Sequence, residues 1–178
     1  MKETELKLEV MRDIHLTDQQ LSAIHALCNQ AYEEDLTSLF NTFTDTTHVL
    51  GYLDKSIVSH AMWVTRWLQS GDGPYLRTAY VEMVATKPLF QRHGLATAVM
   101  RRLAEAISDF ELGGLCPAEP ELYAKLGWAF WHGPLFIRTP EGLISTPDEN
   151  VMILRLPNTP YLDLNLSLSA EWREGEVW

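Results

Sequence analysis

The chain has 178 residues, of which 46% are hydrophobic and 21% charged, a composition typical of a globular domain of ordinary size. We therefore expect one domain spanning residues 1–178. Fourteen Lys and Arg residues oppose 24 Asp and Glu residues, which gives a net charge of −10. Such an excess of acid argues against general binding of nucleic acid or of anionic membranes, because both require basic surfaces. A cationic small-molecule partner is compatible with it.

The acidic excess lies in residues 1–79 and 139–178, whereas residues 80–138 are neutral overall. An anion is therefore tolerated best near the middle of the chain. The two cysteines, Cys28 and Cys116, have neither disulfide-framework nor metal-site spacing, so we expect a reducing cytoplasm and no metal. The charged start, residues 1–5, indicates no signal peptide, and no apolar run has membrane length.

Helices and strands can be placed by periodicity and by capping signals. Leu6, Leu8 and Val10 alternate as in a half-buried strand. Thr17 and Gln20 form a capping box, which predicts a helix over the apolar stripe that follows. A second amphipathic helix follows Gly94, and a short one ends near residues 126–127. The further expected strands are residues 48–53, 56–68, 75–86, 113–116, 128–137 and 151–156. This order is typical of a mixed α+β fold.

The most informative segment is the strand around Tyr80-Val81-Glu82 followed by a loop at Gln91-Arg92-His93-Gly94 and a helix that begins with Leu95-Ala96. The first turn of a helix has free amides, and a Gly without Cβ permits close approach, so this turn can cradle an anion. An ordinary strand-to-helix turn is the alternative reading of the same residues.

The segment Gln91-x-x-Gly94-x-Ala96 resembles motif A of the GNAT acyltransferase superfamily, whose loop binds the pyrophosphate of acetyl-CoA. Tyr123 to Trp128 resembles that family's later Y-x-x-x-G-F/W motif. The resemblance implies a GNAT fold, which is a central mixed, mostly antiparallel sheet flanked by helices, with splayed central strands that bind acetyl-CoA. It implies acetyl-CoA as co-substrate, no metal, and an acetyl-CoA-dependent N-acetyltransferase. Cofactor contacts would fall on Val84, Gln91, Arg92, His93, Gly94, Leu95 and Ala96.

A narrower likeness involves Gly127-Trp128, residues 131–134, the Thr146-Pro147-Asp148 turn and the ending 171–178. Together these resemble the aminoglycoside 2'-N-acetyltransferases. The expected acceptor is then a cationic aminoglycoside, of the 2-deoxystreptamine or the kasugamycin type, and the expected role is antibiotic resistance. A homodimer is implied by the resemblance alone. A GNAT enzyme that acetylates a polyamine or a peptide amine is the main alternative, and a non-catalytic CoA-binding protein is a third.

The resemblance also assigns catalytic roles. Tyr123 would protonate the leaving thiolate, because an ordinary tyrosine pKa of about 10 lies close to that of a thiol. Glu82 would accept the proton of the amine through water, and a backbone amide at or beside Val84 would polarise the thioester carbonyl. The alternatives are that Tyr123 simply packs on a helix face and that Val84 is a core residue. Candidate substrate contacts are Asp35, Glu82, Cys116 as a lining residue, Asp148, Glu149, Glu176 and the terminal carboxylate of Trp178.

Overall fold

The computed structural model describes residues 5–178, so most of the charged start lies outside the described residues. The chain divides into two compact units. Unit 1 consists of Met1–Val64 and Val81–Ala106, and unit 2 of Thr65–Tyr80 and Ile107–Trp178. Two long strands, β3 (Ser56–Ser70) and β4 (Tyr75–Thr86), contribute residues to both units. The single domain therefore stays a prediction.

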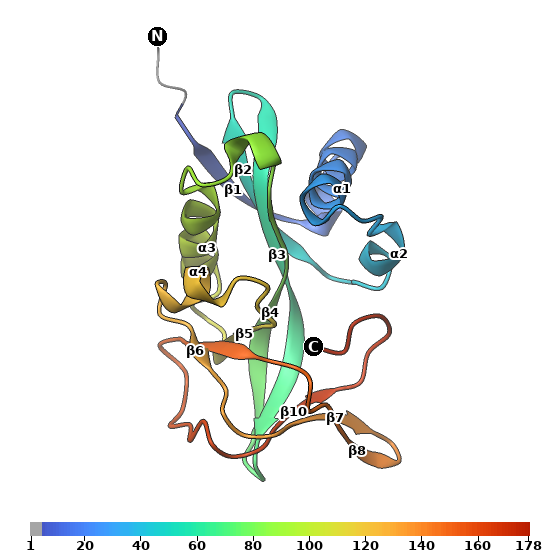
Figure 1. Cartoon of the computed structure of the whole chain (residues 1–178), viewed down its shortest axis with the longest axis vertical. Helices are drawn as coiled ribbons and strands as arrows, with labels where there is room; N and C mark the ends of the chain where they lie inside the picture. The colour runs from blue at the N-terminus through green and yellow to red at the C-terminus, as the bar shows by residue number, and fades with distance from the viewer. Residues whose placement is uncertain (1–4) are drawn as a thin grey trace. The chain divides into compact units, whose positions relative to one another are not determined.

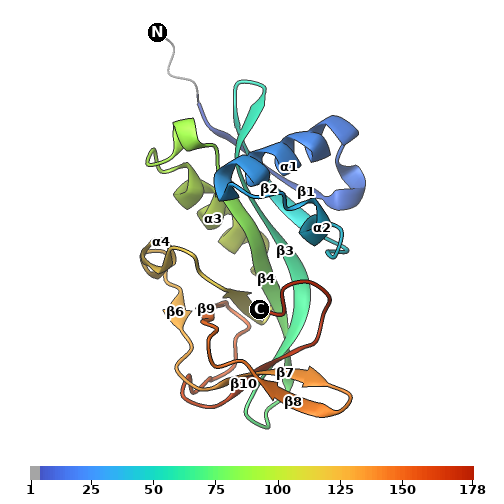
Figure 2. The ribbon, with the colours of Figure 1, turned by 45° about the vertical axis from the view of Figure 1, so that its right-hand side comes forward.

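Unit 1 is a sheet covered by helices on both faces. Strand β2 pairs antiparallel with both β1 and β3, and β4 follows β3 in the strand order. Helices α1 and α2 lie on one face of these strands and α3 lies on the other (Figures 1 and 2). The elements of this unit besides β3 and β4 are β1 (Lys7–Arg12), η1 (Asp13–His15), α1 (Asp18–Tyr32), α2 (Thr37–Phe40), β2 (Thr47–Leu53), η2 (Pro88–Phe90) and α3 (Leu95–Ala106).

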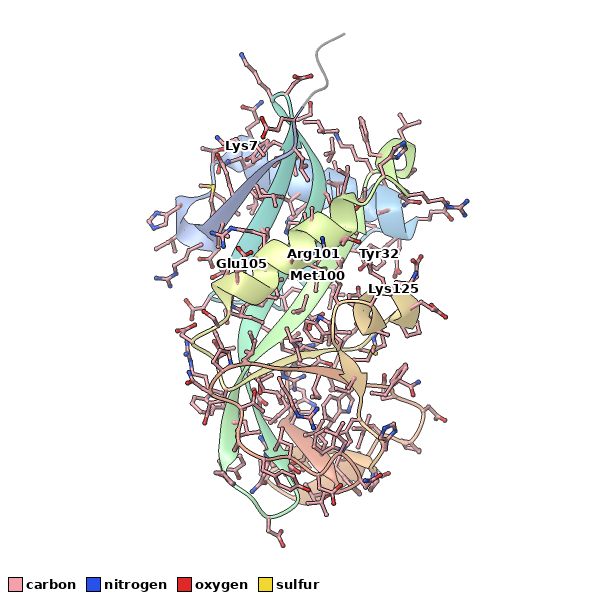
Figure 3. The ribbon with its side chains drawn as sticks, turned by 90° about the vertical axis from the view of Figure 1, so that its left-hand side faces the viewer. Lys7, Tyr32, Met100, Arg101, Glu105 and Lys125 are labelled. Carbon is pink, nitrogen blue, oxygen red and sulfur yellow. The ribbon has the colours of Figure 1, made fainter. Side chains whose placement is uncertain are left out.

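The alternation of β2 decides which side chains face which helix. Leu50 packs with Ile24 and Leu27 of α1 in one apolar cluster. On the opposite face, a Cβ at Gly51 would lie 3.3 Å from Val99 of α3, so the absence of a side chain there lets α3 approach closely. The outer side of α3 carries the exposed residues Arg101 and Glu105 (Figure 3), as its amphipathic pattern predicts.

Unit 2 contains a parallel contact between β4 and β5, over Thr78–Tyr80 and Leu112–Gly114. Strand β9 pairs antiparallel with β5 and with β6. The end of β3 pairs antiparallel with β10, which runs parallel to β7, and β7 forms a hairpin with β8. The elements that lie wholly in this unit are β5 (Leu112–Leu115), α4 (Pro120–Ala124), β6 (Ala129–Phe130), β7 (Leu135–Thr139), β8 (Gly142–Ser145), β9 (Met152–Arg155) and β10 (Leu168–Glu171).

The mixed, mostly antiparallel sheet with flanking helices confirms the predicted fold class, and the capping box of α1 is present with both of its bonds. The single strand expected at residues 128–137 is wrong. The amides of His132 and Gly133 instead donate to the carbonyl of Leu164, and a Cβ at Gly133 would lie 1.8 Å from the carbonyl oxygen of Leu166. This close backbone contact separates β6 from β7. Among residues 5–178, no helix combines the length and the apolar character needed to cross a membrane.

Candidate active site

The carboxyl-terminal half of β4 in unit 1 contains a backbone irregularity. Met83 has a φ of 53°, which is the left-handed region that side chains with a Cβ rarely adopt. Such a residue interrupts the regular ladder and changes the direction of the following peptide group. The next residue is Val84, whose carbonyl accepts a hydrogen bond from the Tyr32 hydroxyl at 3.0 Å. The irregularity thus lies beside Val84, whose amide the family resemblance assigns to the thioester carbonyl.

A chain of buried polar side chains ends at this irregular residue. The Thr46 hydroxyl lies 2.8 Å from His48 Nε2, and His48 Nδ1 lies 2.9 Å from His60 Nε2. His60 Nδ1 lies 2.8 Å from the carbonyl oxygen of Met83. Burial is the main reason why the pKa of His48 is lowered to about 4 and that of His60 to about 3. Both rings are therefore neutral at pH 7.

The loop between β4 and α3 is the segment that the sequence predicts to hold an anion. Gln91, Arg92, His93 and Gly94 are all exposed, whereas the Leu95 side chain is buried and leaves only its backbone for a ligand. Gln91 Nε2 donates to the Thr86 carbonyl at 3.2 Å, which fastens the loop to the strand. Ala96, in the first turn of α3, is half-buried.

Gly94 leaves open space in this cradle. Its φ is 78°, and a Cβ placed on it would have no atom within 4 Å. The first amide to bond back into α3 is that of Ala98, which donates to the Gly94 carbonyl. The earlier amides of the helix are the donors that a helix start offers to an anion. This arrangement fits the pyrophosphate of an acyl-CoA.

Tyr123 in unit 2 is buried on α4, with its ring edge-on to Trp128 at a centroid distance of 6.2 Å. Burial, with a smaller contribution from the charge of Glu119, raises the pKa of Tyr123 to about 12. The phenol is therefore fully protonated at neutral pH. That is the state an acid must have at rest, but the raised pKa of Tyr123 is no longer close to that of a thiol, so the match expected from an ordinary tyrosine pKa does not hold.

Cys116 in unit 2 is exposed, and the charges of two acidic residues act on its thiol. The Cys116 thiol lies 3.8 Å from Glu149 Oε2. Burial and the charges of Glu149 and Glu176 raise the pKa of Cys116 to about 11, so this thiol is not a nucleophile at pH 7. The predicted lining role of Cys116 fits that state. We call Cys116, Glu149 and Glu176 the acidic cluster.

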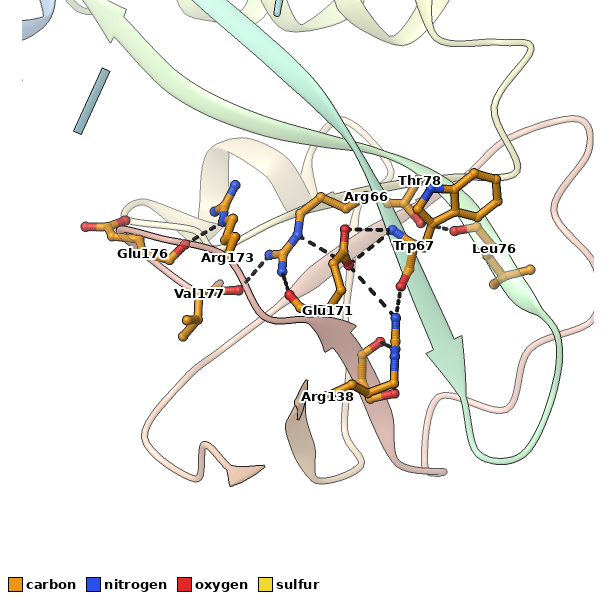
Figure 4. A network of polar contacts seen from close by, with 10 residues as sticks. Arg66, Trp67, Leu76, Thr78, Arg138, Glu171, Arg173, Glu176 and Val177 are labelled. Carbon is orange, nitrogen blue, oxygen red and sulfur yellow. Dashed lines mark hydrogen bonds and ion pairs between the residues drawn. The ribbon is translucent and has the colours of Figure 1, made fainter. Parts of the chain in front are cut away.

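The last residues of the chain are held by a buried arginine (Figure 4). Arg66 Nη1 donates to the Val177 carbonyl at 2.6 Å, and Nη2 donates to the Glu171 carbonyl at 2.5 Å. The Arg66 guanidinium also lies over the rings of Tyr80 and Trp178, 5.0 Å and 6.0 Å from their centroids. This arginine therefore fixes the backbone of the segment that carries Glu176.

Trp178 itself is 3% exposed, and its indole Nε1 donates to the Thr146 hydroxyl at 2.8 Å. Its side chain thus packs within unit 2 and links the end of the chain to the turn before Asp148 and Glu149. Both of these acidic residues are exposed. A role for a terminal carboxylate stays a prediction.

The other two predicted substrate carboxylates lie in unit 1. The Asp35 carboxylate accepts bonds from the Thr37 amide at 3.0 Å and the Thr37 hydroxyl at 2.6 Å. These bonds lower the pKa of Asp35, so it is ionised, but one of its oxygens is engaged by Thr37 at the start of α2. Glu82 is half-buried on β4, next to Met83. The structure therefore divides the predicted site residues between two units.

Sequence reasoning missed Arg66 and the two histidines. A signal for Arg66 was present. It lies two residues from each of the buried residues Val64 and Leu68 on β3, so its side chain faces the interior as theirs do. His48 and His60 lie on adjacent antiparallel strands, where His60 pairs with Leu50, which makes the two rings diagonal neighbours. No group of His, Cys, Asp or Glu suited to hold a metal ion occurs among residues 5–178.

Comparisons with known proteins identify the family. Residues 14–131 match the family described as acetyltransferase (GNAT) domain. The chain is 29% identical, over 96% of its own length and 93% of the relative's, to an aminoglycoside 2'-N-acetyltransferase of Mycolicibacterium fortuitum.

Solved structures share the fold. The GNAT family N-acetyltransferase YhbS of Escherichia coli, crystallised in complex with CoA, matches with a TM-score of 0.65 and 14% identity, over 98% of this chain and 94% of that protein. Eis1 from Mycobacterium abscessus matches with a TM-score of 0.61 and 15% identity, over 73% of this chain and 32% of Eis1. The chain thus spans about a third of Eis1. With the family match over well over half of its length, the chain belongs to the GNAT family and is an acyl-CoA-dependent N-acetyltransferase.

Proposed function

We propose that the protein transfers the acetyl group of acetyl-CoA to the 2'-amine of an aminoglycoside, of the 2-deoxystreptamine or the kasugamycin type. The observation that carries this proposal is the acidic cluster of Cys116, Glu149 and Glu176. Carboxylates bind ammonium groups through charge-assisted hydrogen bonds, and an aminoglycoside carries several such groups. The similarity to an aminoglycoside 2'-N-acetyltransferase over nearly the whole chain supports the same acceptor.

In this proposal the loop Gln91–Ala96 holds the pyrophosphate, with the space beside Gly94 receiving its oxygens. The Val84 amide donates to the thioester carbonyl, where negative charge develops. Acetyl-CoA supplies the activated acyl group. The acceptor nitrogen forms a bond to the acetyl carbon as the carbon–sulfur bond breaks, so two protons must be handled.

The first proton leaves the acceptor amine and passes through water to the Glu82 carboxylate. The second is needed by the departing thiolate, and Tyr123 supplies it, since its hydroxyl stays protonated at neutral pH. The proton on Glu82 then returns through solvent to the Tyr123 phenolate, so the net change is one proton lost from the neutral amine and one gained by the CoA thiol. Because the pKa of Tyr123 lies above that of a thiol, transfer to a free thiolate is uphill, and the proton must move while the carbon–sulfur bond breaks. Tyr123 thus starts in the protonated state that its raised pKa gives it.

An acceptor screen tests the proposal. Purified protein with acetyl-CoA is offered aminoglycosides of both types, a polyamine and a peptide with a free amine, and release of the CoA thiol is followed. We expect release with aminoglycosides and a loss of about 100- to 10,000-fold in kcat for Tyr123→Phe, with little change in KM. Release with the polyamine or the peptide alone would support the alternative acceptor instead. Unchanged turnover of Tyr123→Phe would remove this residue as the acid.

A further inference from the structure

The relay of Thr46, His48 and His60 has only one arrangement of protons. The Met83 carbonyl can only accept, so His60 Nδ1 carries the hydrogen of the 2.8 Å bond. Because the ring is neutral, its Nε2 is bare and accepts from His48 Nδ1 at 2.9 Å. His48 Nε2 is then bare in turn and accepts from the Thr46 hydroxyl at 2.8 Å. All donors of the relay point toward Met83.

The relay is enclosed. His60 and His48 are 0% and 2% exposed, and Thr46 is 7% exposed. The Cys28 sulfur lies 3.8 Å from His60 Nδ1, on the α1 side of the sheet. Three polar side chains in the interior are costly unless each finds a partner. Their partners lead step by step to a single backbone carbonyl.

That carbonyl belongs to the same peptide group as the Val84 amide. A trans peptide is planar, and its C=O and N–H point in opposite directions, while no cis peptide occurs among the described residues. Fixing the Met83 oxygen on His60 therefore aims the Val84 N–H away from the His60 ring. The Tyr32 hydroxyl holds the next carbonyl, that of Val84, at 3.0 Å. Two successive peptide groups of β4 are thus held by side chains.

We infer that His60, oriented by His48 and Thr46, is a positioning residue that fixes the Met83–Val84 peptide so that the Val84 N–H is presented to the thioester carbonyl. The inference rests on the proposed function, because that function gives the Val84 amide its role. His60 does not touch the substrate in this account. A left-handed residue inside a strand is strained and persists only where surrounding contacts hold it, and His60 supplies one such contact.

Kinetics of His60→Leu and His60→Asn test the inference. Leu removes the donor, whereas the Asn amide can occupy the position of Nδ1 and donate again. We expect His60→Leu to lower kcat by about 10- to 100-fold, with the Kd of CoA changed less than about twofold because the loop Gln91–Ala96 is untouched. His60→Asn should recover most of the kcat. The ratio of the Kd of acetyl-CoA to the Kd of CoA should rise in His60→Leu but not in His60→Asn.

The matched control is Leu27→Ala, a truncation in the same α1-facing core, where Leu27 is 1% exposed and outside the relay. It should lower the free energy of unfolding by about 2–5 kcal/mol and leave the ratio of the two Kd values unchanged. An equal loss of kcat in Leu27→Ala would overturn the inference, because instability would then explain the effect. Unchanged kcat in His60→Leu would overturn it as well.

A spectroscopic measurement on the unaltered protein decides the matter even if His60→Leu does not fold. Long-range ¹H–¹⁵N NMR at pH 7 should show both His48 and His60 as neutral Nδ1–H tautomers. An Nε2–H tautomer for either ring would overturn the inference. If no amine is acetylated, the proposed function fails, and the inference is still judged by the tautomers and by the ratio of the two Kd values.

Discussion

His60 Nδ1 lies 2.8 Å from the carbonyl oxygen of Met83, the β4 residue whose φ is 53°. A buried neutral imidazole thus holds the backbone at the point where the strand departs from regular geometry. The bond links the interior of unit 1 to the peptide whose amide is assigned to the thioester carbonyl. It also has a measurable consequence for stability.

The stability of the fold should fall as the pH drops below 6.5. Burial lowers the pKa of His48 to about 4 and of His60 to about 3, with Asp13 opposing the shift of His48, and His25 adding to both. The unfolded chain binds protons from about pH 6.5 downward while the folded rings do not, so each ring removes up to about 1.4 kcal/mol per pH unit. Urea unfolding of the protein and of His60→Asn at pH 7, 5.5 and 4.5 measures this. If the free energy of unfolding fell equally with pH in the protein and in His60→Asn, the expectation would be contradicted.

Gly94→Ala should weaken CoA binding by about 10-fold or more, because the added methyl occupies the space that Gly94 leaves open at the start of α3. The left-handed φ of 78° also costs about 1 kcal/mol of stability. Gly142→Ala is the matched control, because Gly142 has a φ of 130° and open space but lies in the β7–β8 hairpin. Isothermal titration with CoA compares the two. Equal affinities would remove the loop from the cofactor site.

Cys116 should react slowly with a thiol-alkylating reagent. With its pKa raised to about 11, the thiolate is scarce at pH 8, so alkylation should be about 10- to 100-fold slower than for free cysteine. Glu149→Gln and Glu176→Gln each remove a negative charge near the sulfur and should speed the reaction. Glu119→Gln, which removes a charge that does not act on Cys116, is the control. If neither Glu149→Gln nor Glu176→Gln changes the alkylation rate, the acidic cluster is not assembled in solution.

Arg66→Lys should destabilise the protein by about 2–4 kcal/mol, because an ammonium group cannot bond both the Glu171 and the Val177 carbonyls as the guanidinium fork does. The KM for the acceptor should rise, since the backbone carrying Glu176 loses its support, while the KM for acetyl-CoA should change little. Arg77→Lys, at a half-exposed pair with Asp109, should cost less than about 1 kcal/mol. Comparable losses in both variants would remove the special role of Arg66.

Local signals were sufficient for much of the fold. The capping box of Thr17 and Gln20 gave the start of α1, and Gly94 with the apolar stripe behind it gave the start of α3. Both signals act within a few residues, where sequence spacing and spatial distance agree. The β7–β8 hairpin and β10 were missed, because β8 is exposed along its whole length and β10 is a four-residue strand defined by its neighbours.

The candidate loop follows from a local motif, whereas the buried contacts near it depend on residues that are far apart in the sequence. The loop from Gln91 to Ala96 has the form that its spacing predicts. The relay of His48 and His60 depends on the register of two strands and on a φ angle at Met83, neither of which is written in local sequence. Arg66 reaches carbonyls more than 100 residues away, so its partners could only be found in three dimensions.

The position of the acetyl group in the product tests the central claim most directly. Aminoglycosides that differ only in bearing an amine or a hydroxyl at C2' are incubated with acetyl-CoA, and the products are examined by mass spectrometry and two-dimensional NMR. We expect one acetyl group, bonded to the 2'-nitrogen, and no product from the 2'-hydroxyl compounds. Acetylation at any other amine, or equal turnover of both compounds of a pair, would contradict the proposed function.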